Sequence, residues 1–275
     1  MAATQVFDSK TFCIITGGSR GIGRAMAVTF SAKFGPGSTV VLTGRSTADL
    51  SETQRQVQAV APGVNVSVVT ADLANAGTLS ESLSSLTGTT NPSDFQHVLL
   101  INNAASMNDM SRYMKQMTAS DVDYVQQYFM LNLTSMLMLT SHFLRTFPKR
   151  EGLRRTVVNI TSLGAIKPMK TCGLYSTGKA AREMMVRTYV IEEPDVRFLN
   201  YSPGPVDTDM YREIINKSID QEFREMMTDL EAKNVLLKPH QTAAKLAVIL
   251  EGDDFESGAH VDYFDVPEKE ENTSS

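Results

Sequence analysis

The sequence predicts an α/β protein with one doubly wound parallel sheet, arranged as a three-layer α/β/α sandwich. Short apolar runs rich in β-branched residues alternate with helical patterns along most of the 275 residues, which is typical of βαβ units. No linker rich in Pro, Gly or Ser divides the chain. We therefore expect a single domain over residues 1–266, followed at 267–275 by a flexible polar tail that has no apolar residue to dock.

The alternation gives an ordered set of elements. Strands are expected at 11–16, 39–43, 65–70, 97–102, 155–160, 196–201 and 259–262. Apolar residues three and four positions apart predict helices at 24–34, 50–60, 79–86, 119–146, 175–191 and 241–250. Ligands of such sheets bind beyond the carboxyl ends of the strands, so functional residues are expected in the segments that follow the strands.

Composition excludes several classes of function. The net charge of −5 argues against a nucleic-acid partner. No apolar stretch is long enough to span a membrane, and the first ten residues lack a signal pattern. Cys13 and Cys172 provide neither a disulfide framework nor a metal-ligand spacing. We expect a cytoplasmic protein with reduced thiols, no metal, and no nucleic-acid or membrane partner.

Residues 207–239 interrupt the alternation, because they are helix-prone, rich in Met and charge, and longer than an ordinary connection. The segment is a candidate substrate lid. Its methionines, Met210, Met226 and Met227, either line an adaptable apolar pocket or simply pack.

The first predicted strand runs into a glycine-rich turn and then a helix, the context of a Rossmann-type dinucleotide-binding turn. Glycines let the backbone approach a pyrophosphate, and the helix N-terminus offers unpaired N–H groups. A merely tight turn is the alternative, and no Gly-Lys-Ser/Thr follows that would make a Walker A loop. The candidate cofactor residues in this turn are Gly17, Gly18, Ser19, Arg20, Gly21, Ile22 and Gly23.

The end of the second strand favours NADP(H) over NAD(H). An NAD-selective site carries an acid there for the ribose 2′-hydroxyl, whereas this chain has Arg45 and Ser46. Arg20 lies close enough in the chain to join Arg45 in clamping a 2′-phosphate through charge-assisted hydrogen bonds. The alternative is a pair of solvated surface arginines.

Polar residues after the next two strands fall beside the same cofactor. Asp72, followed by Leu73, either accepts from an adenine amino group or caps the following turn. Asn103 follows the fourth strand, where the dinucleotide would pass. Asn132 lies in an otherwise apolar helix, where it either makes a structural hydrogen bond or holds a catalytic water.

Tyr175 and Lys179 are four positions apart in a predicted helix, thirteen residues after Ser162. A helix places such positions on one face, so a phenol and an ammonium can meet at one reacting atom. Alone, this spacing occurs in many solvated helices. After the glycine turn, it indicates a proton donor with its activator.

These motifs together resemble the short-chain dehydrogenase/reductase family over nearly the whole chain. They are TGGSRGIG at 16–23, NNAA at 102–105, Asn132, NITS at 159–162 and Tyr175-x-x-x-Lys179. The resemblance implies that Tyr175 protonates a carbonyl oxygen and that Ser162 hydrogen-bonds it. It also implies that Lys179 lowers the Tyr175 pKa and binds the nicotinamide ribose, that Asn132 holds a relay water, and that two long helices form a homodimer interface.

Within the family, residues 158–163, 178–182, 199–210 and 257–262 resemble members that reduce the side-chain carbonyls of pterins. The implied cofactor contacts here are Val206, Asp207, Thr208, Asp209, Met210 and Tyr211, besides Tyr175 and Lys179. The implied substrate contacts are Ser162, Leu163, Tyr175, Gly204 and Asp262.

Asp262 carries the substrate prediction, because a carboxylate can pair with the 2-amino-pyrimidinone edge of a pterin through two hydrogen bonds. Without the resemblance it is an ordinary solvated turn residue. Asp265 competes for the role but lies outside the matching stretch. Strand alternation would send Asp262 and Phe264 to one face.

Three functions follow in order of preference. The first is NADPH-dependent reduction of pterin side-chain carbonyls, and the second is a broad carbonyl or diketone reductase. The third is a non-catalytic NADPH-binding sensor or scaffold, against which the intact Ser162, Tyr175 and Lys179 set argues.

Overall fold

Seven parallel strands form one sheet in the order β3-β2-β1-β4-β5-β6-β7 within the residues that the computed structural model describes, 6–88 and 90–265. The chain starts in the middle and winds outward in both directions, so the predicted doubly wound α/β/α fold is confirmed. The strands are β1 (Thr11–Thr16), β2 (Thr39–Gly44), β3 (Asn65–Thr70), β4 (His97–Asn102), β5 (Arg154–Ile160), β6 (Val196–Ser202) and β7 (His260–Asp262).

Each strand lies within one residue of its predicted bounds. The helices are α1 (Gly21–Ser31), α2 (Thr47–Val60), α3 (Leu79–Thr87), α4 (Val122–Phe129), α5 (Ser135–Thr146), α6 (Gly173–Glu192), α7 (Asp209–Lys217), α8 (Gln221–Ala232) and α9 (Pro239–Gly252). Several begin earlier than predicted because their first turn consists of capping, glycine or proline residues rather than of the apolar repeat. The helix predicted from residue 24 begins at Gly21, for example.

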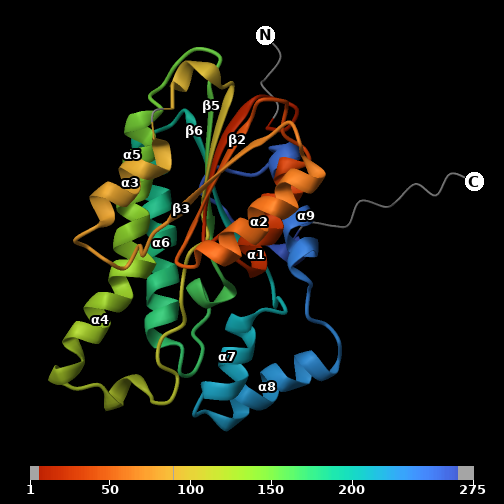
Figure 1. Ribbon diagram of the computed structural model, residues 1–275. Helices are drawn as coiled ribbons and strands as arrows, with labels where there is room; N and C mark the ends of the chain where they lie inside the picture. The colour runs from red at the N-terminus through yellow and green to blue at the C-terminus, as the bar shows by residue number, and fades with distance from the viewer. Residues whose placement is uncertain (1–5, 89, 266–275) are drawn as a thin grey trace, which may run out of the picture.

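Helices cover both faces of the sheet (Figure 1). One layer contains α1, α2 and α9, and its core side chains include Phe30 and Leu246 packed on Ile15. The other contains α3, α5 and α6, where Phe143 packs with Ile14 on the opposite face. Because Ile14 and Ile15 point to opposite faces, one buried strand serves two cores.

The prediction of one continuous helix over residues 119–146 is wrong in one respect. It divides into a 3-10 turn (Ala119–Asp121), α4, a π-helical turn (Met130–Thr134) and α5. The π turn contains Asn132, whose side-chain oxygen accepts from the backbone N–H of Ser106 at 2.9 Å. A contact with a distant loop therefore accompanies a local change in helical pitch.

The prediction that side chains continue to alternate between the two faces of a strand past Asp262 is also wrong. β7 ends at Asp262, and Tyr263–Asp265 form a 3-10 turn. The cause is local, because Asp262 Oδ1 accepts from the N–H of Phe264 at 3.1 Å and Asp265 Oδ2 accepts from the N–H of Asp262 at 2.8 Å. Phe264 is 66% exposed, whereas Tyr263 is buried.

The segment 207–239 forms α7 and α8, which lie beyond the carboxyl ends of the strands (Figure 1). Tyr211, Phe223 and Met227 pack there with Tyr175, at the start of α6, and with Met107, from the loop after β4. Met210 is partly buried in the same cluster, whereas Met226 is half exposed. The segment therefore covers the edge where ligands of this fold bind.

Within the described residues, no helix combines the length and apolarity needed to cross a bilayer. The same residues contain no cluster of three or more His, Cys, Asp or Glu side chains arranged to hold a metal ion.

Candidate active site

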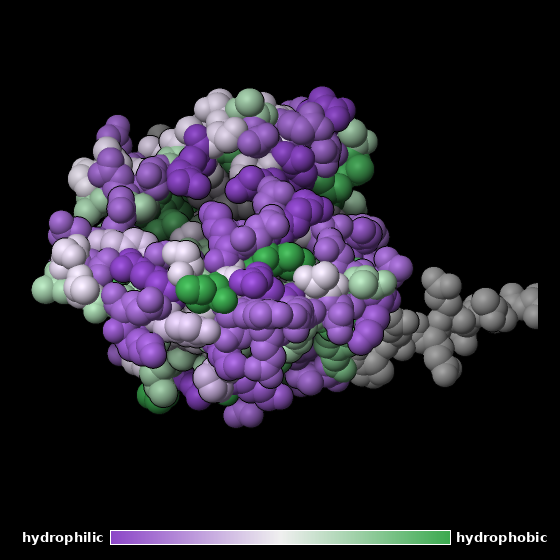
Figure 2. Space-filling view, turned by 90° about the horizontal axis from the view of Figure 1, so that it is seen from below, coloured by the Kyte–Doolittle hydropathy of each residue, from purple (hydrophilic) through white to green (hydrophobic). Residues whose placement is uncertain are grey.

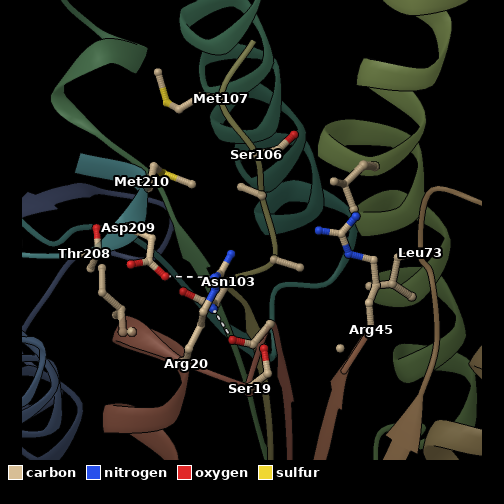
Figure 3. A pocket seen from close by; sticks show the side chains of 18 of the residues that line it. Ser19, Arg20, Arg45, Leu73, Asn103, Ser106, Met107, Thr208, Asp209 and Met210 are labelled. Carbon is tan, nitrogen blue, oxygen red and sulfur yellow. Dashed lines mark hydrogen bonds and ion pairs between the residues drawn. The ribbon is translucent and has the colours of Figure 1, made fainter. Parts of the chain in front are cut away.

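A cavity of about 710 Å³ opens along the carboxyl ends of β1 to β4. Figure 3 shows its walls, which come from the β1–α1 turn, the ends of β2, β3 and β4, and the start of α7. The predicted cofactor residues that line it are Gly17, Ser19, Arg20, Gly21, Ile22, Gly23, Arg45, Asp72, Leu73, Asn103, Asp207, Thr208, Asp209 and Met210. Those that do not line it are Gly18, Ser46, Tyr175, Lys179, Val206 and Tyr211.

The glycine turn forms a backbone cradle. Gly17 and Gly21 have φ of +66° and +54°, which side chains rarely adopt, and a Cβ on Gly23 would lie 2.1 Å from the carbonyl oxygen of Gly17. The Arg20 side chain does not cap the N-terminus of α1. The first N–H groups of α1 thus remain available to an anion, as a pyrophosphate requires.

Asn103 supports this turn. Its Nδ2 donates to the carbonyl oxygens of Thr16, at 2.9 Å, and Gly17, at 3.2 Å. The Thr16 hydroxyl in turn accepts from the backbone N–H groups of Asn103 and Ala104, each at 2.9 Å. Asn103 therefore fixes the glycine turn to the end of β4 as well as lining the cavity.

The two candidate phosphate-binding arginines differ in their partners. Arg20 Nη1 lies 2.8 Å from Asp209 Oδ2, as the dashed line in Figure 3 shows, and both side chains are more than half exposed. Arg45, on the opposite wall of the cavity, makes no hydrogen bond or ion pair with any described residue. Ser46 caps α2 by accepting from the N–H of Asp49 at 3.3 Å.

Asp72 lines the cavity and also caps its own turn, because Oδ1 accepts from the N–H of Ala74 at 3.0 Å. The capping role that the sequence left open is therefore present, and the second carboxylate oxygen has no protein hydrogen bond among the described residues. Leu73, beside it, is buried against the cavity wall.

Ser162, Tyr175 and Lys179 meet beyond the carboxyl end of β5. Tyr175 lies in the first turn of α6, and its hydroxyl is close enough to Ser162 for Ser162 to lower its pKa. Lys179, one turn later, is 5% exposed, and its Nζ lies 5.7 Å from the centroid of the Tyr175 ring. The same Nζ donates to the carbonyl oxygen of Ile160 at 2.6 Å. The structure thus brings the three predicted catalytic residues together.

Burial dominates the electrostatics of this cluster. It raises the pKa of Tyr175, while the hydrogen bond from Ser162 and the positive charge of Arg182 act in the opposite direction. Burial, followed by repulsion from Arg182, holds the pKa of Lys179 well below its ordinary value. Arg182 therefore influences both members of the proton-transfer pair.

Asn132 is buried, and its amide group is hydrogen-bonded within the protein, with one acceptor position left on Oδ1. Besides accepting from Ser106, it donates from Nδ2 to the carbonyl oxygen of Tyr128 at 2.9 Å and to Ser106 Oγ at 3.2 Å. The structural hydrogen bonds considered from sequence are present, and they tie α4 and the π turn to the loop after β4.

Asp262 lies at the carboxyl end of β7, paired in register with Ser202 of β6. Its Oδ2 accepts from Ser202 Oγ at 2.6 Å, and the residue is only partly buried. Gly204, two residues after Ser202, has φ of +73°, and Phe264 and Tyr263 lie 3.5 Å from the point where a Cβ would stand. Asp262 and Gly204 thus share one corner of the sheet edge.

The candidate site has two parts. The 710 Å³ cavity takes in the cofactor residues, but Ser162, Leu163, Tyr175, Lys179, Gly204 and Asp262 do not line it. Met107 and Met210 line the cavity and also belong to the apolar cluster that contains Tyr175. Met107 and Met210 therefore connect the two parts.

Two functional residues on or next to α6, Asn108 and Arg182, were not predicted from the sequence. Asn108 Oδ1 accepts from the N–H of Tyr175 at 3.1 Å and so caps the start of α6, but an isolated Asn in a loop carries no signal of that contact. Arg182 did carry a signal, because positions 175, 179 and 182 share one helix face and a charged residue on a buried face is unusual.

Comparisons with known proteins agree with this site. The sequence pattern of the family described as short chain dehydrogenase matches residues 11–218. The chain is 42% identical over 256 residues to sepiapterin reductase from Bos taurus, covering 93% of this chain and 95% of that protein. It is 30% identical to benzil reductase ((S)-benzoin forming) from Bacillus subtilis (strain 168). That match covers 86% of this chain and 92% of the reductase.

The fold has close structural counterparts. The crystal structure of the KRED1-Pglu enzyme superposes with a TM-score of 0.74 at 22% identity, covering 91% of this chain and all of that one. The protein is an oxidoreductase that acts on carbonyl or alcohol groups with a nicotinamide cofactor, and it belongs to the short-chain dehydrogenase family.

Proposed function

We propose that this protein reduces the side-chain carbonyls of pterins with NADPH, taking sepiapterin to 7,8-dihydrobiopterin and 6-pyruvoyl-tetrahydropterin to tetrahydrobiopterin. The observation that carries the proposal is the 42% identity to a sepiapterin reductase over almost the full length of both chains. Asp262 adds a chemical reason, since a partly buried carboxylate stands at the same sheet edge as Ser162 and Tyr175.

The residues around the cavity fit NADPH. The N–H groups at the start of α1 would bind the pyrophosphate, with Gly17 and Gly23 allowing its close approach. Arg45, which has no ion-pair partner among the described residues, would bind the 2′-phosphate, joined by Arg20 on release from Asp209. The absence of an acid at the end of β2 supports NADPH over NADH. Bound NADPH supplies the hydride for the reduction.

The protein's own groups would handle the proton. Tyr175 would donate its phenolic proton to the substrate oxygen, and Ser162 would hydrogen-bond that oxygen. Lys179 would stabilise the phenolate left behind, and Asn132 would hold a water that returns the proton. Burial of Tyr175 and Lys179 keeps bulk water from competing for these bonds.

Asp262 would anchor the pterin ring. Each of its oxygens already accepts one hydrogen bond, from Ser202 Oγ and from the N–H of Phe264. A carboxylate has about four acceptor positions, two on each oxygen. Asp262 therefore retains one free acceptor position on each oxygen for the two N–H donors of a 2-amino-pyrimidinone. Gly204 and Leu163 would border the same substrate, and the segment 207–239 would act as a lid.

A substrate panel tests the proposal. The purified protein should oxidise NADPH with sepiapterin and do so far more slowly with NADH. Tyr175→Phe should abolish turnover while still binding NADPH. If no carbonyl is reduced by a protein that binds NADPH, the pterin proposal fails and the non-catalytic sensor or scaffold is favoured.

The second candidate is a broad carbonyl or diketone reductase. It is supported by the 30% identity to benzil reductase and by exposed apolar side chains near Ser162, where Leu163 and Ile166 are 44% and 53% exposed. Comparable kcat/KM values for sepiapterin and a small diketone would favour this candidate.

We also propose a homodimer in the cytoplasm, built as one domain over residues 1–266; the tail expected at 267–275 lies outside the described residues. Exposed apolar side chains on α5 and α6 support the dimer, namely Met138, Met184 and Ile191. The buried free thiols Cys13 and Cys172 are consistent with a reducing compartment. Sedimentation of wild type and of Ile191→Glu would test the interface.

A further inference from the structure

Thr171 adopts a backbone conformation that is unusual for its residue type. Its φ of +61° lies in the left-handed region, and the residue is buried. The other non-glycine residues with positive φ in the described part of the chain are Asp8, Asn234 and Asp253, and Asp and Asn enter this region readily. Threonine does not, because its Cβ is branched. Its surroundings therefore impose this conformation, as they often do near functional sites.

Thr171 stands directly before the catalytic helix. It precedes Cys172, the N-cap of α6, and lies four positions before Tyr175. The buried Asn108, from the loop after β4, holds both ends of this stretch. Its Nδ2 donates to the carbonyl oxygen of Thr171 at 2.8 Å, and its Oδ1 accepts from the N–H of Tyr175 at 3.1 Å. One planar amide group thus connects the backbone of Thr171 to the first turn of α6.

The Thr171 side chain contacts the segment 207–239. Its Oγ1 lies 2.9 Å from Oγ of Ser218, in the turn between α7 and α8, and both residues are buried. The Thr171 hydroxyl donates to the carbonyl oxygen of Lys170 at 2.7 Å. Because a hydroxyl has one proton to donate, Ser218 is the donor in the contact with Thr171. A hydrogen bond from the segment therefore reaches the residue that leads into α6.

The turn between α7 and α8 makes two further contacts with the loop after β4. The N–H of Ile219 donates to the carbonyl oxygen of Met110 at 2.9 Å. Asp220 Oδ2 accepts from the hydroxyl of Tyr113, also at 2.9 Å. This is the loop that carries Asn108, so the turn docks on the same structure that holds the start of α6.

The base of the segment is a separate attachment. Val206 and Leu237 form a parallel β-bridge there, and Lys238 Nζ lies 3.0 Å from Asp207 Oδ2. Figure 1 shows α7 and α8 beyond the carboxyl ends of the strands. The turn that contains Ser218 lies between the two ends of the base in the chain, so it can leave its docking site while the base stays closed.

We propose that Thr171 is a positioning residue that links closure of the segment 207–239 to the placement of Tyr175. When the α7–α8 turn is docked, Ser218 holds Thr171 in its left-handed conformation, and Asn108 ties Thr171 to the N–H of Tyr175. When the turn leaves, Thr171 relaxes and the first turn of α6 loosens. Substrate enters the open form, and the proton donor is in place only after closure. The inference rests on the proposed roles of Tyr175 as proton donor and of the segment as a lid.

Amide hydrogen exchange of the NADPH-free protein, followed by NMR, tests this link without turnover. Ser218→Ala removes the contact with Thr171, and the Ser218 side chain makes no hydrogen bond to α6 among the described residues. We expect faster exchange in two places, over α7 and α8 and at the N–H of Tyr175. Faster exchange confined to α7 and α8, or unchanged exchange at Tyr175, would overturn the proposal.

The kinetics of Thr171 variants separate positioning from stability. Thr171→Gly loses the hydroxyl but adopts a positive φ without strain, so it should be at least as stable as Thr171→Ala. We nevertheless expect both variants to lower kcat for sepiapterin about tenfold, as for the loss of one hydrogen bond, with NADPH affinity within a few-fold of wild type. Thr171→Ser keeps the hydroxyl and should recover most of the loss. Wild-type kcat in Thr171→Gly would contradict the proposal.

A double-mutant cycle shows whether Thr171 and Ser218 act as one unit. Ser218→Ala should reproduce the kcat loss of Thr171→Ala, and the double variant should lose no more than either single one. Losses that multiply would mean that the two residues act independently, against the proposal.

Thr177→Ala on α6 and Thr228→Ala on α8 are the matched controls. Both hydroxyls donate to backbone carbonyls of their own helices, at 2.8 and 2.9 Å, so neither variant should change kcat or the exchange of Tyr175. Equal effects in these controls would overturn the proposal. If wild type reduces no carbonyl, the proposed function has failed, whereas the exchange of the free protein still decides whether the α7–α8 turn governs the start of α6.

Discussion

His260 Nδ1 lies 2.7 Å from Glu183 Oε1, and this one contact joins the last strand to the catalytic helix. The same oxygen accepts from the hydroxyl of Thr161 at 2.6 Å. Thr161 precedes Ser162, and His260 stands two residues before Asp262. One buried carboxylate therefore links the proton-transfer residues to the proposed substrate anchor.

This contact predicts a pH-dependent contribution to stability. The hydrogen bond to Glu183 raises the pKa of His260, which burial opposes. Burial favours protonation of Glu183, but the bonds from His260 and Thr161 hold its pKa below the ordinary value. The stability that protonated His260 contributes is fully present below pH 6.5, the ordinary pKa of histidine. It is lost as the pH rises through the raised pKa of His260. The stability that ionised Glu183 contributes is fully present above pH 4.5, the ordinary pKa of glutamate, and is lost as the pH falls through its lowered pKa.

We therefore expect His260→Gln to destabilise the protein most between pH 4.5 and 6.5, by about 1–2 kcal/mol, and less above neutral pH. Urea denaturation at several pH values measures the difference. His142→Gln is the contrast, since burial lowers the pKa of His142 and wild type should lose that advantage as pH falls. A His260 effect that does not change with pH would contradict the charged pair.

Removal of the Tyr175 hydroxyl should stop the chemistry without unfolding the site. Tyr175→Phe retains the ring that packs with Met107 and Tyr211. We expect kcat to fall by about 10²–10⁴-fold, the range for loss of a general acid, with NADPH affinity within a few-fold of wild type. Stopped-flow turnover and cofactor titration separate the two quantities. Substantial residual turnover would mean that another group donates the proton.

Arg45 should decide the choice between NADPH and NADH. Arg45→Ala removes a guanidinium that faces the cavity without an ion-pair partner among the described residues. A charged hydrogen bond contributes about 1.5–3 kcal/mol, so the NADPH Kd should rise about tenfold or more, with little change for NADH. Arg55→Ala, which removes an exposed arginine paired with Glu52, is the control. Equal losses for both cofactors would argue against a 2′-phosphate site.

The glycine cradle predicts an asymmetry between two Gly→Ala substitutions. A Cβ on Gly23 would meet the carbonyl oxygen of Gly17 at 2.1 Å, whereas one on Gly63 meets nothing closer than 4.0 Å. Gly23→Ala should cost about 1–3 kcal/mol of stability and abolish NADPH binding, and Gly63→Ala should change neither. Normal NADPH affinity in Gly23→Ala would show that the cradle does not hold the cofactor.

The sequence predicted the central strands well because β1, β4, β5 and β6 are apolar runs buried on two faces, which few other structures accommodate. It missed the π turn because that turn depends on Asn132 meeting Ser106, a contact set by the tertiary fold. Figure 2 shows the mixed polar and apolar surface over the carboxyl-end face, seen from below. No periodicity in the sequence predicts how α7 and α8 cover that face.

The site was predictable in its parts but not in its electrostatics. Helical spacing placed Tyr175 and Lys179 on one face, and the family resemblance added Ser162. The sequence could not show that Lys179 bonds to Ile160, nor that Arg182 is buried, because burial and side-chain direction are properties of the packed interior.

The central claim, that Asp262 makes this enzyme a pterin reductase, is tested most directly by kcat/KM of Asp262→Ala with sepiapterin and with a small diketone. Asp262→Asn and Asp265→Ala serve as the matched variants. Loss of two charge-assisted hydrogen bonds should lower the sepiapterin value by roughly 10²-fold or more and leave the diketone value within a few-fold. Equal losses on both substrates, or no loss with sepiapterin, would contradict the account.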